Sequence, residues 1–366
     1  MHQNFSFMQH FSRLLTSLLL LLCLQDQLWA QQKSISFGMQ AHLGSIIASE
    51  PEAAYVRDSY TSFIEASVRW QKDGSQPWHR ANNYPQLGIA AFYGNPGSRQ
   101  YIGKLAGVLP FIHFPVVRGE RFKSGFRLGT GAAWIEKPYR VHTNHKNTLL
   151  GSSFNYFISL MLENEVKISK ELSLSAGVSF SHLSNSDIKM PNFGLNLPTV
   201  SVGARWSPHE TILEKKTLPR QARNLDWRVF ATAGTKQTPW VGSPRYVVPA
   251  LNAEVAKPLG ASGAWGVGAA LQYDKSLNSD PSGYALTKNG SKNLQAGVHF
   301  FYERKLGALS LPLQLGAYVL NPEKGQTFYQ TLGIRYRIGK HWSAAFNLKA
   351  HGLQVDYTHA GFGYHF

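Results

Sequence analysis

Residues 171–184 alternate strictly between two kinds of side chain. The even positions from Leu172 to Phe180 are apolar, and the odd positions from Ser173 to Ser181 are serine or glycine. Successive side chains of a β-strand point to opposite faces, so a period of two indicates a strand with one apolar and one polar face. Apolar residues elsewhere also occur mainly in alternation, which predicts an all-β fold.

The N-terminus indicates secretion. Arg13 precedes an apolar run over Leu14–Leu24, and a small residue, Ala30, offers a cleavage site. The run is short for a spanning helix, so residues 1–30 are predicted to be a signal peptide. Cys23 could mark a lipoprotein anchor, but Leu22 stands where such a signal has a small residue. Cleavage after Ala30 would leave a mature chain without cysteine, which excludes disulfides and thiol chemistry.

A second long apolar run is absent, which excludes a helical membrane protein. Few residues are charged (16%), whereas aromatic residues (13%) and glycine are abundant. Secreted strands with one apolar face predict an antiparallel transmembrane β-barrel of the outer-membrane type. The last strand ends on the aromatic Phe366, which resembles the assembly signal of such barrels. We therefore expect location in the outer membrane of a Gram-negative bacterium, with outer-membrane lipid and the barrel-assembly machinery as partners.

The alternation predicts about 16 strands (14–16). We expect one large barrel, with two tandem eight-stranded units as the alternative. The predicted divisions are 31–207, a linker or long periplasmic turn at 208–225, and further strands at 226–366. Short connections, for example at 118–120 and 169–170, are assigned to the periplasm, where outer-membrane barrels keep their turns tight. The 70–84 and 208–224 connections are long for such turns.

Polar residues extend the apolar face of the 171–184 strand at its outer end. His182 and Ser184 share the parity of the apolar positions, and Asn196 has the same parity in the returning strand. A candidate base and a candidate nucleophile therefore lie on the lipid-facing surface near the outer leaflet. Polar side chains gain little from such a place, so they call for a functional reason.

The sequence around these polar residues resembles that of a known family. The segments 180–185 (FSHLSN) and 191–196 (PNFGLN) look like the signature of the lipid A 3-O-deacylases, the PagL-type acyloxyacyl hydrolases of outer membranes. Weaker similarities lie at 125–131, 137–139 and 147–152. The resemblance covers roughly residues 33–207 and, apart from the barrel ending, accounts for nothing after residue 225.

The resemblance implies a serine esterase that removes an ester-linked acyl chain from lipid A. Ser184 would be the nucleophile and His182 its general base. Candidates for stabilising the oxyanion are Asn185, Asn192 and Gly194.

The third member of the catalytic group departs from the family pattern. Well-known members have a glutamate where this chain has Asn196, and an asparagine orients a histidine without supplying charge. Asp187 is a candidate substitute acid because it is close in sequence.

The net charge of +16 suggests a polyanionic partner. Lipid-facing strands and a secretion signal exclude nucleic acid as this partner. Lipopolysaccharide, the polyanion of the outer membrane, is therefore the expected partner. In the 136–149 loop, Lys137, Arg140 and Lys146 are candidates for contacts with lipid A phosphates; the alternative is an ordinary solvated loop. His142 and His145 have no flanking acid or cysteine in ligand spacing, so neither a metal site nor another cofactor is predicted.

Two alternatives to the esterase stay open: a pore for small solutes, and a structural or adhesive barrel with a decayed site. The pore depends on the second half of the chain, since sixteen strands could enclose water. Charged residues on the lumen parity predict an interior charge network; these are Arg127, Glu163, Glu165, Arg205 and Arg228.

Overall fold

The computed structural model describes residues 35–47, 51–186, 188–209, 212–218, 224–238, 243–278, 293–322, 326–352 and 354–366. The predicted signal peptide lies outside these residues, as do Cys23 and Asp187. Strands dominate the described chain, and none of its helices is long and apolar enough to cross a membrane. Sixteen strands are found, so the predicted all-β fold and strand number are confirmed.

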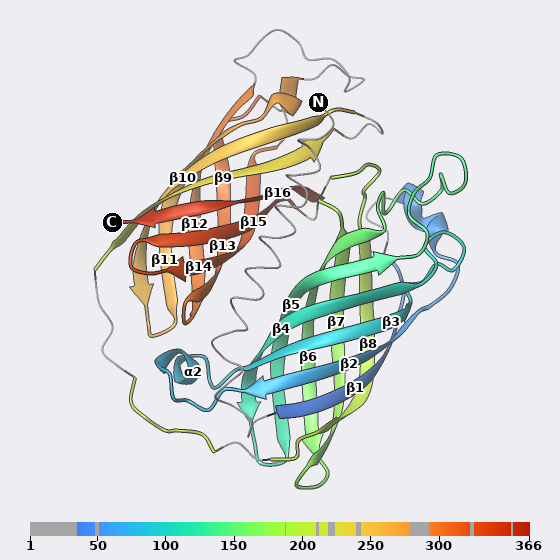
Figure 1. Cartoon of the computed structure of the whole chain (residues 1–366), viewed down its shortest axis with the longest axis vertical. Helices are drawn as coiled ribbons and strands as arrows, with labels where there is room; N and C mark the ends of the chain where they lie inside the picture. Colours follow the sequence, from blue (N-terminus) through green and yellow to red (C-terminus); the bar gives the residue numbers. More distant parts are fainter. Residues whose placement is uncertain are drawn as a thin grey trace.

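The strands form two closed barrels of eight antiparallel strands each (Figure 1). The first contains β1 (Ile35–Gly44), β2 (Thr61–Gln71), β3 (Gln86–Asn95), β4 (Leu105–Arg118), β5 (Phe122–Ile135), β6 (Phe154–Lys167), β7 (Leu172–Ser184) and β8 (Leu195–Trp206). The second contains β9 (Asp226–Gln237), β10 (Arg245–Leu259), β11 (Gly263–Tyr273), β12 (Leu294–Leu306), β13 (Leu309–Leu320), β14 (Phe328–Ile338), β15 (Trp342–His351) and β16 (Gln354–His365).

The two tandem units are therefore the arrangement found, and the single large barrel is not. β8 pairs with β1, and β16 pairs with β9, so each group of eight satisfies its own two edges. Alternation along a strand is the same in either arrangement, because it reports the faces of a sheet and not the partner of its edge strand.

Each barrel has a turn end, with the chain's short turns, and a loop end, with its longer connections. At the turn end of the first barrel, β4 and β5 are joined at 119–121 and β6 and β7 at 168–171. The longer β5–β6 and β7–β8 connections lie at the loop end. Two short 3-10 helices, η1 (Pro51–Val56) and η2 (Lys275–Asn278), lie in the β1–β2 and β11–β12 connections.

Charged side chains cross the lumen of the first barrel near its middle. The two terminal nitrogens of the Arg127 guanidinium donate to the two carboxylate oxygens of Glu65, at 2.5 and 2.6 Å. Arg205 Nε donates to Glu165 at 2.7 Å, and Arg69 pairs with Glu163. The predicted charge network is thus present, and its arginines are buried rather than bathed in water.

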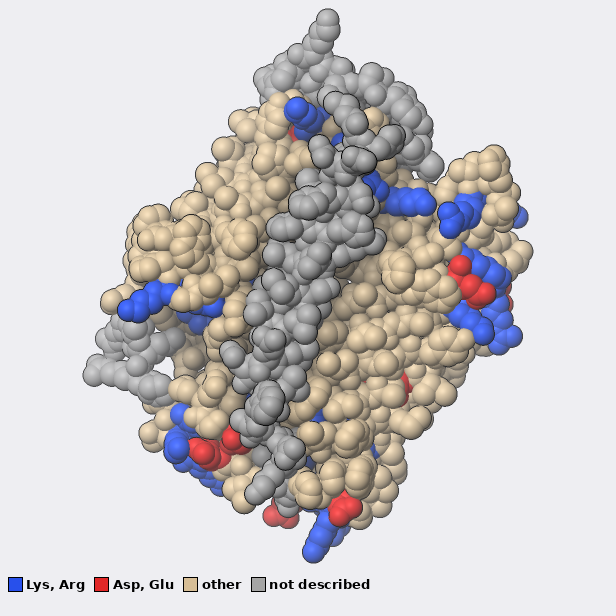
Figure 2. All heavy atoms as spheres, viewed as in Figure 1, with Lys and Arg blue, Asp and Glu red and all other residues tan. Residues whose placement is uncertain are grey.

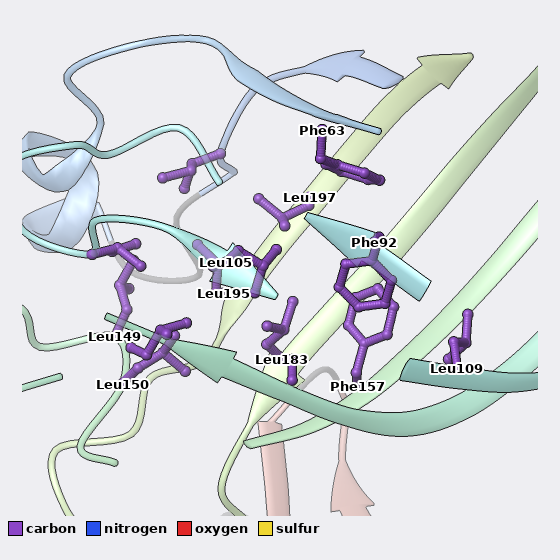
Figure 3. Close-up of a cluster of buried hydrophobic side chains, with 14 of the residues drawn as sticks. Phe63, Phe92, Leu105, Leu109, Leu149, Leu150, Phe157, Leu183, Leu195 and Leu197 are labelled. Atoms are coloured by element: carbon purple, nitrogen blue, oxygen red, sulfur yellow. The ribbon is translucent and has the colours of Figure 1, made fainter. Parts of the chain in front are cut away.

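Towards the loop end, the lumen of the first barrel becomes apolar. Phe92 and Phe157 meet with ring centroids 4.5 Å apart, and residues of the connecting loops close over them. Figure 3 shows this cluster, which includes Phe63, Phe92, Leu105, Leu109, Leu149, Leu150, Phe157, Leu183, Leu195 and Leu197. Side chains therefore fill the described lumen at two levels.

The second barrel has a comparable interior. Glu254 accepts from Arg228 at 2.8 Å and from Arg335 at 2.7 Å. Lys236 contacts the carboxylates of Asp274 and Asp356 at 2.7 and 2.8 Å. Arg228 is fully buried, so the level that it occupies is not a water-filled passage. This interior gives no support to the pore alternative.

The outer walls carry the apolar side chains. Many exposed residues on the outward parity are large and apolar, for example Val178, Val202, Val267 and Leu315. Figure 2 shows Lys, Arg, Asp and Glu gathered towards the ends of the barrels, with uncharged side chains between them. This distribution suits strands that cross a lipid bilayer.

A short helix explains one connection that is long for a turn. Between β2 and β3, α2 (Pro77–Ala81) packs Trp78 against Leu306 of the second barrel and Ile112 of the first. Asn82 Oδ1 accepts a hydrogen bond of 2.6 Å from Arg304 Nε, and Asn82 Nδ2 donates to the Lys305 carbonyl. The segment thereby joins the turn ends of the two barrels.

Candidate functional site

His182 and Asn196 are direct partners in the register of β7 and β8. Their side chains meet on the outer wall, where His182 Nδ1 lies 2.7 Å from Asn196 Oδ1. An amide oxygen only accepts, so this hydrogen bond places the imidazole proton on Nδ1. Nε2 keeps its lone pair, is buried, and has no hydrogen-bond partner among the described residues. The ring is therefore held in the tautomer that a general base requires.

Ser184 lies on the same face of β7 as His182, two residues nearer the loop end. Its side chain is 3% exposed, and its Oγ accepts a hydrogen bond of 3.3 Å from the Ser186 backbone N–H. It makes no hydrogen bond with His182 Nε2. Rotation of the serine side chain would have to bring the two together, and catalytic hydrogen bonds often tighten only when substrate is bound.

The polarity of the two faces inverts at this site. Below it, the lumen face of β7 is serine and glycine, and the outer face is apolar. At the site the outer face carries His182, Ser184 and Asn196, while Leu183 and Leu195 on the lumen face are fully buried. The polar groups are thus backed by a packed apolar core, which fixes the strand ends that carry them.

Gly194 is positioned against the imidazole. Its φ of +79° favours glycine, and a Cβ built there would lie 2.6 Å from His182 Cε1. The backbone N–H of Gly194 donates to the Leu149 carbonyl at 3.0 Å. In this conformation that N–H holds two loops together and does not point at an oxyanion.

The other two oxyanion candidates also hydrogen-bond within the loop. Asn192 Oδ1 accepts from the Asn185 backbone N–H at 3.0 Å, and Asn185 Nδ2 donates to the Lys189 carbonyl at 2.8 Å. A side-chain amide has two N–H groups, so Asn185 retains one further donor. The candidate substitute acid, Asp187, lies outside the described residues.

The basic candidates lie on the neighbouring β5–β6 loop, and all three are exposed. Lys137 Nζ donates to the Arg99 carbonyl at 2.9 Å and so anchors its own loop. Arg140 forms a backbone bridge with Asn144, and the Lys146 carbonyl accepts from Tyr55. Lys137 is thus committed to a structural contact that the sequence did not reveal.

One feature near the site was missed by sequence reasoning. The Met190 backbone N–H, in the β7–β8 loop, lies 3.3 Å from Gln237 Oε1 of the second barrel. Tyr156, the register partner of Ser184, contacts Phe346 of β15. The sequence offered two tandem units as an alternative to the single barrel, but it contained no pattern that places a wall of the second unit beside this one.

Comparisons with known proteins agree with this architecture. Residues 64–205 match the family model of the lipid A 3-O-deacylase PagL, and residues 225–366 match that of the acyloxyacyl hydrolase C-terminal domain. No curated protein matches the chain. The solved structure of the outer membrane enzyme PagL is 17% identical and covers 45% of this chain and 97% of its own, with a TM-score of 0.29.

Larger barrels also match. The toluene transporter TodX of Pseudomonas putida is 10% identical, with 91% of this chain and 88% of TodX covered and a TM-score of 0.17. A porin of Rhodopseudomonas blastica is 6% identical, with 91% and 100% covered and a TM-score of 0.18. The two family models match one barrel each, the first from β2 to β8 and the second from β9 to β16. The chain therefore belongs to the PagL-like family of outer-membrane β-barrel proteins.

Proposed function

We propose that this chain is an outer-membrane serine esterase that hydrolyses an ester-linked acyl chain of lipid A. The observation that carries the proposal is the imidazole of His182, held by Asn196 with an unpartnered, buried Nε2, on the same lipid-facing wall as Ser184. The family match supports ester hydrolysis in general. The serine mechanism, the role of Asn196 in place of an acid and the lipid A substrate are parts of the proposal.

The chemistry follows from the positions of the three side chains. Ser184 Oγ attacks the ester carbonyl while His182 Nε2 takes its proton. The imidazolium then protonates the leaving sugar oxygen, and the acyl group stays on the serine. A water molecule, deprotonated by the same Nε2, attacks this acyl-enzyme and releases the fatty acid. Asn196 orients the imidazole throughout, and the free N–H of the Asn185 amide is a candidate donor for the oxyanion.

The substrate fits the location of the site. Lipid A carries its acyl chains within the outer leaflet, so an ester beside the sugar lies at the depth of a serine near the loop end of the outer wall. Ser184 is buried, so the side chains that cover it would have to move to admit the ester. Neither the sugar nor the chain would need to enter the filled lumen. Exposed Arg140 and Lys146 on the adjacent loop are the proposed contacts for lipid A phosphates. Lys137 anchors the same loop and so helps to hold these two side chains in place.

The test is mass spectrometry of lipid A from cells that express the protein. We expect loss of one ester-linked acyl chain with the wild-type protein and none with Ser184→Ala or His182→Ala. The matched control is Ser181→Ala, on the same strand but facing the lumen, where Ser181 donates to Ser159 at 2.9 Å. Comparable amounts of folded protein must be present. An unchanged lipid A profile with the wild type would refute the esterase, and activity in Ser184→Ala would refute the serine mechanism.

A further inference from the structure

We propose that the second barrel supplies one wall of the groove that holds the acyl chain, with Phe346 as a specificity-determining residue. This inference rests on the proposed function of Ser184 as nucleophile. It assigns the C-terminal half of the chain a part in the reaction at the first barrel.

The two barrels touch through their outer walls. Ile112 is on the outward parity of β4, where a lipid-facing residue would be exposed, yet it is 7% exposed and packs in a cluster with Leu306 and Trp78. Leu309 and Leu311 of β13 join the same cluster. The Asn82–Arg304 hydrogen bond holds the contact at the turn end.

A further contact between the barrels lies beside the candidate site. The rings of Tyr156 and Phe346 have centroids 6.0 Å apart. Tyr156 and Ser184 are register partners on adjacent strands, and such pairs have Cβ atoms roughly 5 Å apart on a shared face. Phe346 is therefore separated from the nucleophile by a single side chain.

An acyl chain finds no room in the lumen of the first barrel behind the site. The lumen behind the site is closed by Leu183, Leu195 and the rest of the apolar cluster, so the chain must run along the outer wall. From Ser184 towards the middle of the membrane that wall presents the outward side chains of β6 and β7, including Leu160 and Phe180. A chain lying on them is bounded on the β6 side by Phe346 of the second barrel.

The second barrel is also linked to the β7–β8 loop above the site. Gln237, at the loop end of β9, contacts the Met190 backbone N–H, and Asn185 and Asn192 hydrogen-bond within the same loop. Two points of the second barrel thus border the site, one on the wall and one on the loop.

A photoreactive probe tests the placement without turnover. The full-length Ser184→Ala protein, in vesicles, is exposed to a lipid A analogue with a diazirine at the end of its ester-linked chain, and the labelled peptides are mapped. We expect labelling of β15 as well as β6 and β7, and competition by unmodified lipid A. A diazirine phospholipid serves as the control for general lipid contact, and the β12 peptide around Phe300 as the control for an exposed outer wall. For each probe, the labelling of β15 is divided by that of β12. The inference would be overturned if this ratio were no higher for the lipid A analogue than for the phospholipid.

A second measurement concerns chain length. Phe346→Ala should shift the released fatty acids towards longer or bulkier chains. The preference of the enzyme for a chain over one that is a methylene longer should weaken by about tenfold. Phe300→Ala, an exposed outward phenylalanine on the same barrel, should leave the distribution unchanged. An unaltered distribution in an active Phe346→Ala protein would overturn the assigned role of Phe346. Absence of hydrolysis in the wild type would instead refute the proposed function, and the labelling experiment would still decide where the chain lies.

Discussion

His182 Nδ1 and Asn196 Oδ1 lie 2.7 Å apart across the register of β7 and β8. The pair holds the imidazole as a carboxylate would, but the neutral amide of Asn196 would supply no counter-charge to the imidazolium of the proposed reaction. Orientation and charge stabilisation, which one glutamate provides together, are thus separated in this chain.

Asn196→Glu should therefore accelerate the reaction. A carboxylate at this position would keep the proton on Nδ1 and would also stabilise the imidazolium. About 1.4 kcal/mol of added transition-state stabilisation raises the rate tenfold, so we expect kcat to rise by about tenfold. The measurement is the rate of fatty acid release from purified lipid A. Asn196→Leu, which can do neither, should be slower than the wild type. A rate for Asn196→Glu at or below that of the wild type would show that charge at this position does not limit catalysis.

Gly194→Ala should impair activity more than folding. The added methyl group meets the imidazole at 2.6 Å and must displace it, and a misplacement of about 1 Å can cost on the order of a hundredfold in rate. The matched control is Gly339→Ala, with a φ of +64° and nothing within 4 Å of the new Cβ. Both variants carry a backbone penalty of roughly 1–2 kcal/mol for an L residue in the left-handed region, so Gly339→Ala separates that penalty from the clash with the imidazole. Equal activity of the two would argue against the close fit of Gly194 to His182.

The strands could be predicted because each residue reports its own face. The described residues contain sixteen strands, as the alternation predicted, and the parity that put His182, Ser184 and Asn196 on one face also holds. The number of barrels could not be predicted, because closure depends on which distant edges pair. The apolar lumen around Leu183 was missed. There the polar side chains move to the outer face and the apolar ones to the lumen face, and over only two or three residues this exchange looks like the end of a strand. The contact of Phe346 with Tyr156 joins residues far apart in sequence and leaves no local pattern.

Arg127→Ala should destabilise the first barrel strongly. It would leave the Glu65 carboxylate buried without its bidentate partner, which costs about 3–5 kcal/mol, whereas replacing both members with apolar residues costs much less. The temperature at which the folded form is lost in heat-modifiability gels should fall for Arg127→Ala and recover in Arg127→Met/Glu65→Leu. Arg140→Ala, on the exposed loop, should not change it. A stable single variant would mean that water or another lumen cation compensates the carboxylate.

The docking of α2 against the second barrel should weaken in acid. Burial, and secondarily the charge of Lys72, lower the pKa of His79 from 6.5 to about 4, although Asp73 opposes this shift from 3.2 Å away. Hydrogen bonds from Ser75 lower the pKa of Asp73 despite its partial burial, so this carboxylate stays charged in the same range. An undocked segment binds a proton on His79 near pH 6.5, but the docked segment does so only near pH 4. The stability of docking is therefore fully present above about pH 6.5 and is lost as the pH falls towards 4. Hydrogen exchange of residues 72–86, normalised to intrinsic rates, should show protection at pH 7 that declines at pH 5 in the wild type. In His79→Gln, which cannot take up the proton, protection should be the same at both values. An equal decline in both proteins would assign the pH dependence to another group.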